Sequence, residues 1–287
     1  MLQWRGGPYQ RVSISIWTKR ALRSDDEVTD SGSQLLEGRQ ALVTGGGTGI
    51  GQRFAEVLAR NGAHVVICGR RSEPLEATAE RIRTFGGQVT TVVADVTRPE
   101  DLSELANAAQ GTDVLVNNAG YSLRGPWTEV TVEAWREVMM VNVEAPFRLA
   151  QLFVPSMVDR GWGRVINIGS VYGLLTGNPY FYPDFEWDAA SYITSKHALI
   201  GLSKYLAARV ASNGVTVNTI SPGMFPDTPA NRDSLSEESR ARLSSFTPSG
   251  RNGQLEDLDS TLLYLASPAS SFITGQNIIV DGGWTCW

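Results

Sequence analysis

The segment QALVTGGGTGIG, residues 40–51, joins an apolar run to a glycine-rich turn and then to the first residues of a helical pattern. The apolar run, 40–45, is typical of a strand that is buried on both faces. Gly45, Gly49 and Gly51 leave the backbone free of side chains where the helix begins, so amide N–H groups and the helix dipole can approach a pyrophosphate. Glycines also suit any tight turn, but their place between a strand and a helix predicts nucleotide binding.

The alternation of strand and helix continues along the chain. Further apolar runs cover residues 64–69, 89–96, 113–120, 164–170, 215–223 and 277–283. Stretches with helical periodicity and a glycine at the end, such as GQRFAEVLARNG at 51–62, separate these runs. Repeated strand–helix units require parallel strands joined by right-handed crossovers. We therefore expect an α/β fold: a Rossmann-type doubly wound parallel sheet of about seven strands in a three-layer α/β/α arrangement, with ligands bound at the carboxyl ends of the strands.

Composition favours one domain that acts on small molecules. The 287 residues, 42% of them hydrophobic, are enough for one large core. The net charge of -5 argues against a nucleic-acid partner, which needs a basic surface. No apolar run approaches the ~20 residues that span a bilayer, so we expect no membrane insertion. Two cysteines and two histidines form neither a disulfide framework nor a metal-ligand pattern, and we expect a reducing compartment, the cytoplasm, and no metal.

The first residues differ from the rest, and we expect the folded domain to cover 38–287. Before Asp25 every charged residue is basic, which suits a mitochondrial transit peptide and hence the mitochondrial matrix. The alternatives for residues 1–37 are a disordered extension or an upstream start codon artefact.

The end of the second apolar run bears on the choice of cofactor. An acid there would accept a hydrogen bond from the adenosine ribose and repel a 2′-phosphate, but the residue is Gly69. Arg70 and Arg71 follow and offer forked donors for a phosphate, although a solvated loop can also carry two arginines. We predict NADP(H). Asp95 ends the third run, where a carboxylate can accept from the adenine amino group or can simply cap a turn.

The stretch SYITSK, residues 191–196, places Tyr192 and Lys196 on one helix face. The lysine charge then lies close to the phenol oxygen, an arrangement that suits proton transfer. Taken alone, such a pair more often belongs to an ordinary half-exposed helix face.

Four motifs occur in order along the chain: TGGGTGIG at 44–51, NNAG at 117–120, SYITSK and SPG at 221–223. With them the sequence resembles the short-chain dehydrogenase/reductase family from about Gly38 to the VDGG at 280–283. The resemblance implies a catalytic set of Asn142, Ser170, Tyr192 and Lys196. Together with the assignments above, the expected cofactor contacts are Gly45, Gly47, Thr48, Gly49, Ile50, Gly51, Arg70, Arg71, Asp95, Val96, Asn118, Ala119, Gly120, Tyr192, Lys196, Pro222, Gly223, Phe225 and Thr228.

The resemblance also implies a reaction, the interconversion of a ketone and a secondary alcohol by hydride transfer. A ketone that accepts hydride at carbon needs a proton at oxygen, which Tyr192 supplies as general acid, or removes as base in the other direction. Lys196 and the oxidised nicotinamide are expected to lower the pKa of Tyr192. By family analogy, Ser170 orients the carbonyl oxygen and Asn142 holds a water that links Lys196 to solvent.

The sequence departs from the family pattern in two places. Ser170 and Tyr192 lie 22 positions apart, which is longer than the usual interval and predicts an aromatic insertion at 174–190. Thr228 lies one position later than the family's threonine, with Asp227 in the expected place, in a segment, 224–253, that we interpret as a substrate lid or a solvated excursion. The aromatic and basic residues expected to line a substrate pocket, or else to cover the core or a neighbouring subunit, are Tyr121, Arg124, Trp127, Tyr180, Phe181, Tyr182, Phe185 and Trp187.

Several functions stay open on this evidence. The first is an NADP(H)-dependent carbonyl reductase for a bulky, partly apolar ketone. The second is an NAD-dependent polyol or sugar-acid dehydrogenase, and the third is a non-catalytic nucleotide-binding scaffold. A 3-oxoacyl reductase acting on a carrier protein is disfavoured by the acidic charge balance. The apolar helices expected near 132–160 and 192–213 are either core or, as the resemblance implies, the contacts of a homotetramer or homodimer.

Overall fold

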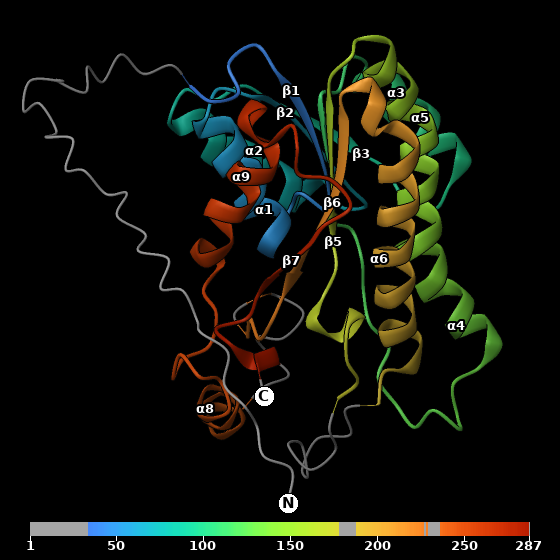
Figure 1. The fold of residues 1–287 in the computed structure, drawn as a ribbon, viewed down its shortest axis with the longest axis vertical. Helices are drawn as coiled ribbons and strands as arrows, with labels where there is room; N and C mark the ends of the chain where they lie inside the picture. Colours follow the sequence, from blue (N-terminus) through green and yellow to red (C-terminus); the bar gives the residue numbers. More distant parts are fainter. Residues whose placement is uncertain (1–33, 178–187, 227, 229–235, 287) are drawn as a thin grey trace, which may run out of the picture. The chain divides into compact units, whose positions relative to one another are not determined.

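The computed structural model describes residues 34–177, 188–226, 228 and 236–286. In this part of the chain seven strands form one sheet in the order β3-β2-β1-β4-β5-β6-β7, with every neighbouring pair parallel (Figure 1). The strands are β1 (Gln40–Thr44), β2 (His64–Gly69), β3 (Val89–Val93), β4 (Val114–Asn117), β5 (Gly163–Ile168), β6 (Val215–Pro222) and β7 (Asn277–Val280). Each strand lies on one of the predicted apolar runs, and the doubly wound parallel sheet is confirmed.

Helices cover both faces of the sheet (Figure 1). One face carries α1 (Gly49–Arg60), α2 (Ser72–Thr84) and α9 (Asp259–Ala266), and the other carries α3 (Pro99–Ala108), α5 (Ala145–Asp159) and α6 (Ala190–Val210). The alternation of side chains in β1 shows how both cores are filled. Ala41 and Val43 pack into the first core and Leu42 into the second, because successive side chains of a strand point to opposite faces.

The compact unit begins at Gln34, a few residues before the predicted start at Gly38. Leu36 is fully buried, and its backbone N–H donates to the carbonyl oxygen of Asn61 at 2.8 Å. Apolar packing therefore draws the end of the expected extension into the fold. The rest of that extension, 1–33, lies outside the described residues. So do the predicted pocket aromatics Tyr180, Phe181, Tyr182, Phe185 and Trp187, as well as Asp227.

The helix expected over 132–160 is two helices joined by a wider, π-helical turn. α4 (Val132–Met139) leads into a π-helical turn at Met140–Glu144, and α5 follows without a break. This turn contains Asn142, in keeping with the frequent use of π-turns at functional sites. None of the helices in the described part of the chain is long and apolar enough to cross a bilayer.

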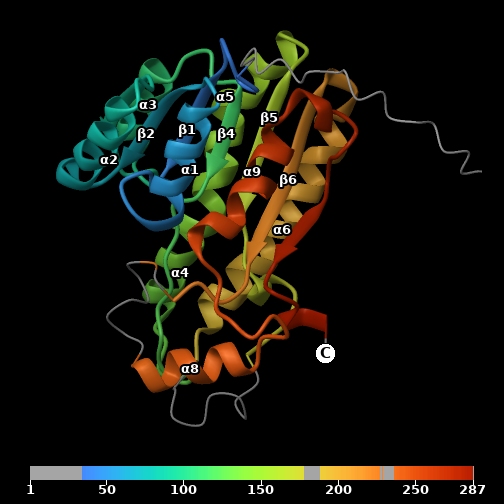
Figure 2. The ribbon, with the colours of Figure 1, turned by 90° about the vertical axis from the view of Figure 1, so that its left-hand side faces the viewer.

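The segment between β6 and α9 extends past the carboxyl ends of the strands. Its described helix, α8 (Glu237–Ser245), lies across that end of the molecule, close to the C-terminus (Figure 2).

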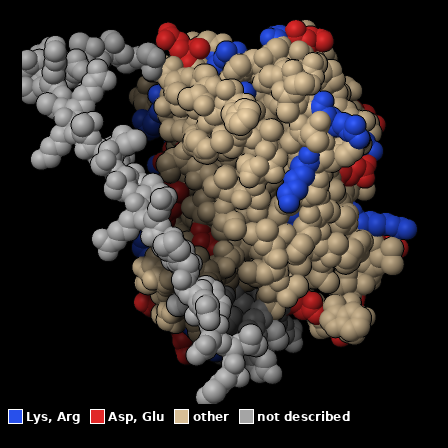
Figure 3. Space-filling model, in the orientation of Figure 1, with Lys and Arg blue, Asp and Glu red and all other residues tan. Residues whose placement is uncertain are grey.

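The broad face over α6, β7 and α9 carries few charged side chains (Figure 3). Large hydrophobic side chains are exposed on these elements and on the loop before β7. They are Tyr205, Tyr264, Phe272 and Ile279, of which Phe272 is 99% exposed.

Candidate active site

One cavity of about 810 Å³ opens at the carboxyl ends of β1, β2, β4, β5 and β6, the edge at which parallel α/β sheets bind ligands. Most of the predicted site residues line it. They are Gly45, Gly47, Thr48, Gly49, Ile50, Arg70, Arg71, Asp95, Val96, Asn118, Ala119, Gly120, Ser170, Tyr192, Lys196, Pro222, Gly223, Phe225 and Thr228. Gly51 and Asn142 are not among the lining residues.

The glycine-rich turn joins β1 to α1. Gly45 and Gly49 have positive φ angles of 65° and 58°, a backbone conformation that favours glycine. Gly51 lies behind the turn, where an added Cβ would be 2.3 Å from the carbonyl oxygen of Gly45. Gly51 therefore lets α1 pack closely on the turn and does not face the cavity, in contrast to its predicted cofactor contact.

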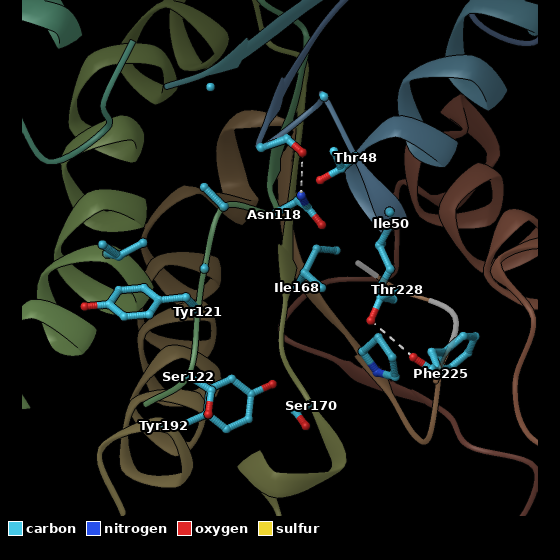
Figure 4. A pocket seen from close by; sticks show the side chains of 18 of the residues that line it. Thr48, Ile50, Asn118, Tyr121, Ser122, Ile168, Ser170, Tyr192, Phe225 and Thr228 are labelled. Atoms are coloured by element: carbon cyan, nitrogen blue, oxygen red, sulfur yellow. Dashed lines mark hydrogen bonds between the residues drawn. The ribbon is translucent and has the colours of Figure 1, made fainter. Parts of the chain in front are cut away.

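The NNAG segment after β4 is tied to the end of β1. The hydroxyl of Thr44 accepts from the backbone N–H groups of Asn118 and Ala119, each at 3.0 Å. The side-chain amide of Asn118 donates to the carbonyl oxygen of Thr44 at 2.9 Å. It also donates to the carbonyl oxygen of Gly45 in the turn at 3.3 Å (Figure 4). These bonds fix two strand ends side by side and hold the backbone of the turn open to a ligand.

The end of β2 has room and positive charge for a phosphate. A Cβ on Gly69 would meet no atom closer than 3.7 Å, and that atom belongs to Leu75. Arg70 and Arg71 follow and line the cavity. The space and the guanidinium donors fit the 2′-phosphate of an adenosine ribose, and the turn fits the pyrophosphate.

Asp95 is a turn-capping residue at the same end of the cavity. Its Oδ1 accepts from the backbone N–H and the hydroxyl of Thr97 at 3.0 and 2.7 Å. Burial alone would raise the pKa of Asp95, but the Thr97 bonds and the charges of Arg70 and Arg98 hold it below its ordinary value. The carboxylate therefore stays ionised and caps the turn. Its contact with the adenine amino group stays a prediction.

Tyr192 and Ser170 come together at the other end of the cavity. Tyr192 lies in the first turn of α6, Ser170 follows β5, and the phenol oxygen points toward the serine hydroxyl (Figure 4). Burial raises the pKa of Tyr192, while its hydrogen bond with Ser170 and the charge of Arg124 counter part of that rise. Ser170 also accepts from the backbone N–H of Tyr172 at 3.1 Å, which fixes its rotamer.

Lys196 lies one turn further along α6, with its side chain buried. Its Nζ donates to the carbonyl oxygen of Ile168 at 2.7 Å and lies 5.5 Å from the centre of the Tyr192 ring. Burial lowers the pKa of Lys196 to about 8. The influences that lower the pKa of Tyr192 in this structure are Ser170 and Arg124, so the expected effect of Lys196 on the phenol is not among them.

Asn142 joins the π-turn to the segment after β4 and to α6. Its Nδ2 donates to the carbonyl oxygen of Tyr121 at 3.0 Å and to the hydroxyl of Ser195 at 2.9 Å, and its Oδ1 accepts from the N–H of Tyr121. The side chain is thus occupied by protein groups and sets the distance between these elements. That Asn142 holds a water linking Lys196 to solvent stays a prediction.

The substrate side of the cavity is only partly as predicted. Tyr121 and Arg124 line it, whereas Trp127 is 70% exposed and lies outside it. Residues that the sequence reasoning missed are Ser122, Leu123, Tyr172 and Met224. Their closeness to a motif could have predicted that they line the cavity, because each lies within four residues of NNAG, Ser170 or SPG.

Residues 45–285 match the profile of the family described as "Enoyl-(Acyl carrier protein) reductase". The chain belongs to the short-chain dehydrogenase/reductase family. As a member of it, the protein is an oxidoreductase that interconverts CH–OH and C=O groups.

Members of the family with different substrates are about equally similar to this chain. Galactitol 2-dehydrogenase (L-tagatose-forming) of Cereibacter sphaeroides is 36% identical and covers 88% of this chain and 97% of its own. The 3-oxoacyl-[acyl-carrier-protein] reductase FabG of Vibrio cholerae is also 36% identical, and the similarity covers 86% of this chain and 98% of that protein.

Solved structures of the family share the fold. A gluconate 5-dehydrogenase of Burkholderia cenocepacia, in complex with NADP and tartrate, has a TM-score of 0.80 and 35% identity and covers 89% of this chain and 99% of its own. The predicted cofactor agrees with such structures, because several of these short-chain dehydrogenases hold NADP or NADPH.

Proposed function

We propose that the protein is an NADP(H)-preferring oxidoreductase that interconverts a ketone and a secondary alcohol. One observation carries the proposal: a single cavity is lined at one end by Arg70 and Arg71 and at the other by the Tyr192–Ser170 pair. The first pair suits a phosphorylated nucleotide, and the second suits proton transfer to a carbonyl oxygen.

The residues at the reacting end have complementary roles. When bound, NADPH supplies a hydride to the carbonyl carbon. Ser170 hydrogen-bonds the carbonyl oxygen and orients it, and Tyr192 donates its proton to that oxygen. Because burial raises the pKa of Tyr192, the phenol holds this proton at neutral pH. Lys196, with a pKa of about 8, is still largely protonated there and keeps a positive charge at the reacting end.

Cofactor preference is tested by fluorescence titration of NADPH and NADH into the wild type and an Arg70→Ala/Arg71→Ala variant. We expect tight NADPH binding that falls about 10²- to 10⁴-fold in the double variant, while NADH binding stays unchanged, because charge-assisted bonds to phosphate contribute about 1.5–3 kcal/mol each. Arg83→Ala, near the far end of α2, is the matched control. Equal affinity of the wild type for both cofactors would refute the preference. Binding without turnover of any ketone would favour the scaffold alternative.

A finer proposal concerns the substrate. Arg124 lines the cavity near the reacting end, and its charge acts on both Tyr172 and Tyr192. A positive charge in this cavity favours a ketone substrate that also carries a carboxylate. Relatives named gluconate 5-dehydrogenase support a sugar-acid substrate in preference to a bulky apolar ketone.

The matched pair of probes for this proposal is 5-ketogluconate and L-tagatose, six-carbon ketones with and without a carboxylate. We expect the wild type to reduce 5-ketogluconate with the higher kcat/KM. Arg124→Gln should remove that advantage, and Arg124→Lys should keep part of it. A wild type that prefers L-tagatose, or an aromatic ketone, would overturn the carboxylate proposal and leave the oxidoreductase reaction standing.

We also propose that the protein is a homotetramer or homodimer. The weakly charged face over α6, β7 and α9 and its exposed Phe272 and Tyr205 support association of copies. Light scattering on the purified chain should give two or four times the 31.2 kDa of one chain. A mass equal to one chain at micromolar concentration would contradict the proposal.

A further inference from the structure

The C-terminal turn, residues 281–286, contacts two parts of the chain that are distant from each other in sequence. Just before the turn, the carbonyl oxygen of Val280 accepts from the N–H of Gly223 at 2.9 Å. Within the turn, the carbonyl oxygen of Gly282 accepts from the N–H of Ser249 at 3.0 Å. The turn thus lies against the start of the segment 224–253 and against the chain that leaves α8.

The backbone of this turn is built for close approach. Gly282 and Gly283 have positive φ angles of 64° and 93°. A Cβ on Gly282 would lie 2.5 Å from the hydroxyl oxygen of Ser249. The Asp281 carboxylate accepts from the N–H groups of Gly283 and Thr285, each at 2.8 Å, which fixes the turn independently of its neighbours.

Trp284 extends from this turn into a small apolar cluster beneath α8. The indole is 8% exposed and packs with the buried Leu243 and with Phe246 and Met224. Its ring meets the Phe246 ring edge-on, with centroids 6.4 Å apart. The cluster is separate from the two cores that pack on the sheet. α8 also has polar contacts outside the cluster: the carbonyl oxygen of Arg240 accepts from Asn252 Nδ2 at 2.9 Å, and the Arg240 guanidinium donates to the carbonyl oxygen of Pro226 at 3.4 Å.

Met224 connects this cluster to the active-site cavity. It packs against the Trp284 cluster and also lines the cavity, beside Gly223 and Phe225. Its carbonyl oxygen accepts from the N–H of Gly253 at 2.8 Å, which joins the start of the segment to its end. A change in the Trp284 cluster therefore reaches the cavity wall through one side chain.

We infer that Trp284 is a positioning residue for the substrate: acting through Met224 and α8, it sets the cavity wall on the substrate side without touching the cofactor end. The inference rests on the proposed oxidoreductase function for its kinetic consequence. Its structural consequence, the ordering of α8, does not depend on that function. Removal of the indole should weaken substrate binding while leaving NADPH binding intact.

The test compares Trp284→Ala and Trp284→Phe with Trp162→Ala. Trp162 serves as the matched control because it is a partly buried tryptophan that stacks with Arg39 and Arg164, away from the cavity. With 5-ketogluconate and NADPH, we expect Trp284→Ala to raise KM about tenfold and to change kcat by less than about twofold. Trp284→Phe should keep a KM close to that of the wild type. The NADPH affinity of both Trp284 variants should equal that of the wild type.

Hydrogen exchange of the α8 amides gives a readout that needs no turnover. Exchange over residues 237–245 should accelerate in Trp284→Ala and stay at the wild-type rate in Trp162→Ala. If the wild type reduces no ketone, the proposed function fails, and faster exchange over α8 still supports the positioning role. Unchanged exchange over α8, or a KM effect that Trp162→Ala reproduces, would overturn the inference.

Discussion

The two ends of the cavity are built in different ways. At the cofactor end, the lining residues follow the ends of β1, β2 and β4, and the turn is fixed by bonds such as that from Asn118 to Thr44. At the substrate end, the wall consists of side chains from long connections, among them Arg124 and Met224. The first design gives a rigid site for a common cofactor, and the second lets substrate choice change with a few side chains on an unchanged sheet.

The two ends meet at Tyr192, and the largest expected effect lies there. Tyr192→Phe removes the proton donor and should lower kcat about 10²- to 10⁴-fold, because general acid catalysis contributes rate factors of that size. NADPH affinity should fall by no more than about fivefold, since Tyr192→Phe removes one hydroxyl and leaves the other expected cofactor contacts in place. Tyr205→Phe is the control, being an exposed tyrosine on the same helix. Residual activity above about a tenth of the wild type would assign the proton donor to another group.

The rigidity of the cofactor end is tested next, at Gly51. An alanine Cβ would lie 2.3 Å from the oxygen of Gly45 and 2.4 Å from the side-chain nitrogen of Asn118, so the turn must shift. Overpacking of this kind costs about 1–3 kcal/mol of stability. If NADPH binding must restore the shape of the turn, the same cost lowers NADPH affinity about 5- to 150-fold. Gly201→Ala on α6 meets no atom within 4 Å and should bind NADPH normally. Normal NADPH binding by Gly51→Ala would show that the turn is pliable.

The protonation state of Lys196 should set how the reaction depends on pH. Burial lowers the pKa of Lys196 to about 8, so the ammonium is present below that pH and is lost above it. The pKa of Tyr192 is raised, so its proton remains over the same range. Hence kcat/KM for ketone reduction should fall above pH 8, approaching tenfold per pH unit. In Lys196→Arg, any activity that remains should lack this fall below pH 10. A wild-type profile that is flat to pH 10 would contradict the role given to Lys196.

The same contrast explains how far the sequence predicts the molecule. The seven strands and the cofactor end depend on neighbours in sequence: an apolar run, then glycines, then a helix. The run 164–170, for example, contains most of β5 and ends on Ser170. The substrate end depends on contacts between residues far apart in the chain. Nothing in the sequence near SPG indicates that Met224 packs with Trp284, 60 residues later.

Long-range contacts also explain the residues whose predicted roles were incomplete. Gly51 belongs to the expected motif, but only the close approach of Gly45 reveals that it faces away from the cavity. Asn142 has its side chain bound to Tyr121 and Ser195, which lie 21 and 53 positions away. A motif therefore identifies the residue, and the tertiary contacts decide which of its atoms remain for a ligand.

The smallest effect is expected where the substrate end is held by a single side-chain bond. Asp188 precedes α6; its carboxylate accepts from the N–H of Trp127 at 2.6 Å, and its carbonyl oxygen accepts from the N–H of Gly125 at 2.9 Å. These bonds hold the segment that carries Arg124 against the start of the helix that carries Tyr192. Asp188→Ala removes the first bond only, worth about 1 kcal/mol, so KM for 5-ketogluconate should rise about fivefold with NADPH affinity unchanged. Asp188→Asn keeps an acceptor oxygen, so its KM should lie between that of the wild type and that of Asp188→Ala. A loss of NADPH affinity in Asp188→Ala would mean that the two ends of the cavity are coupled, and the separation drawn between them would then be wrong.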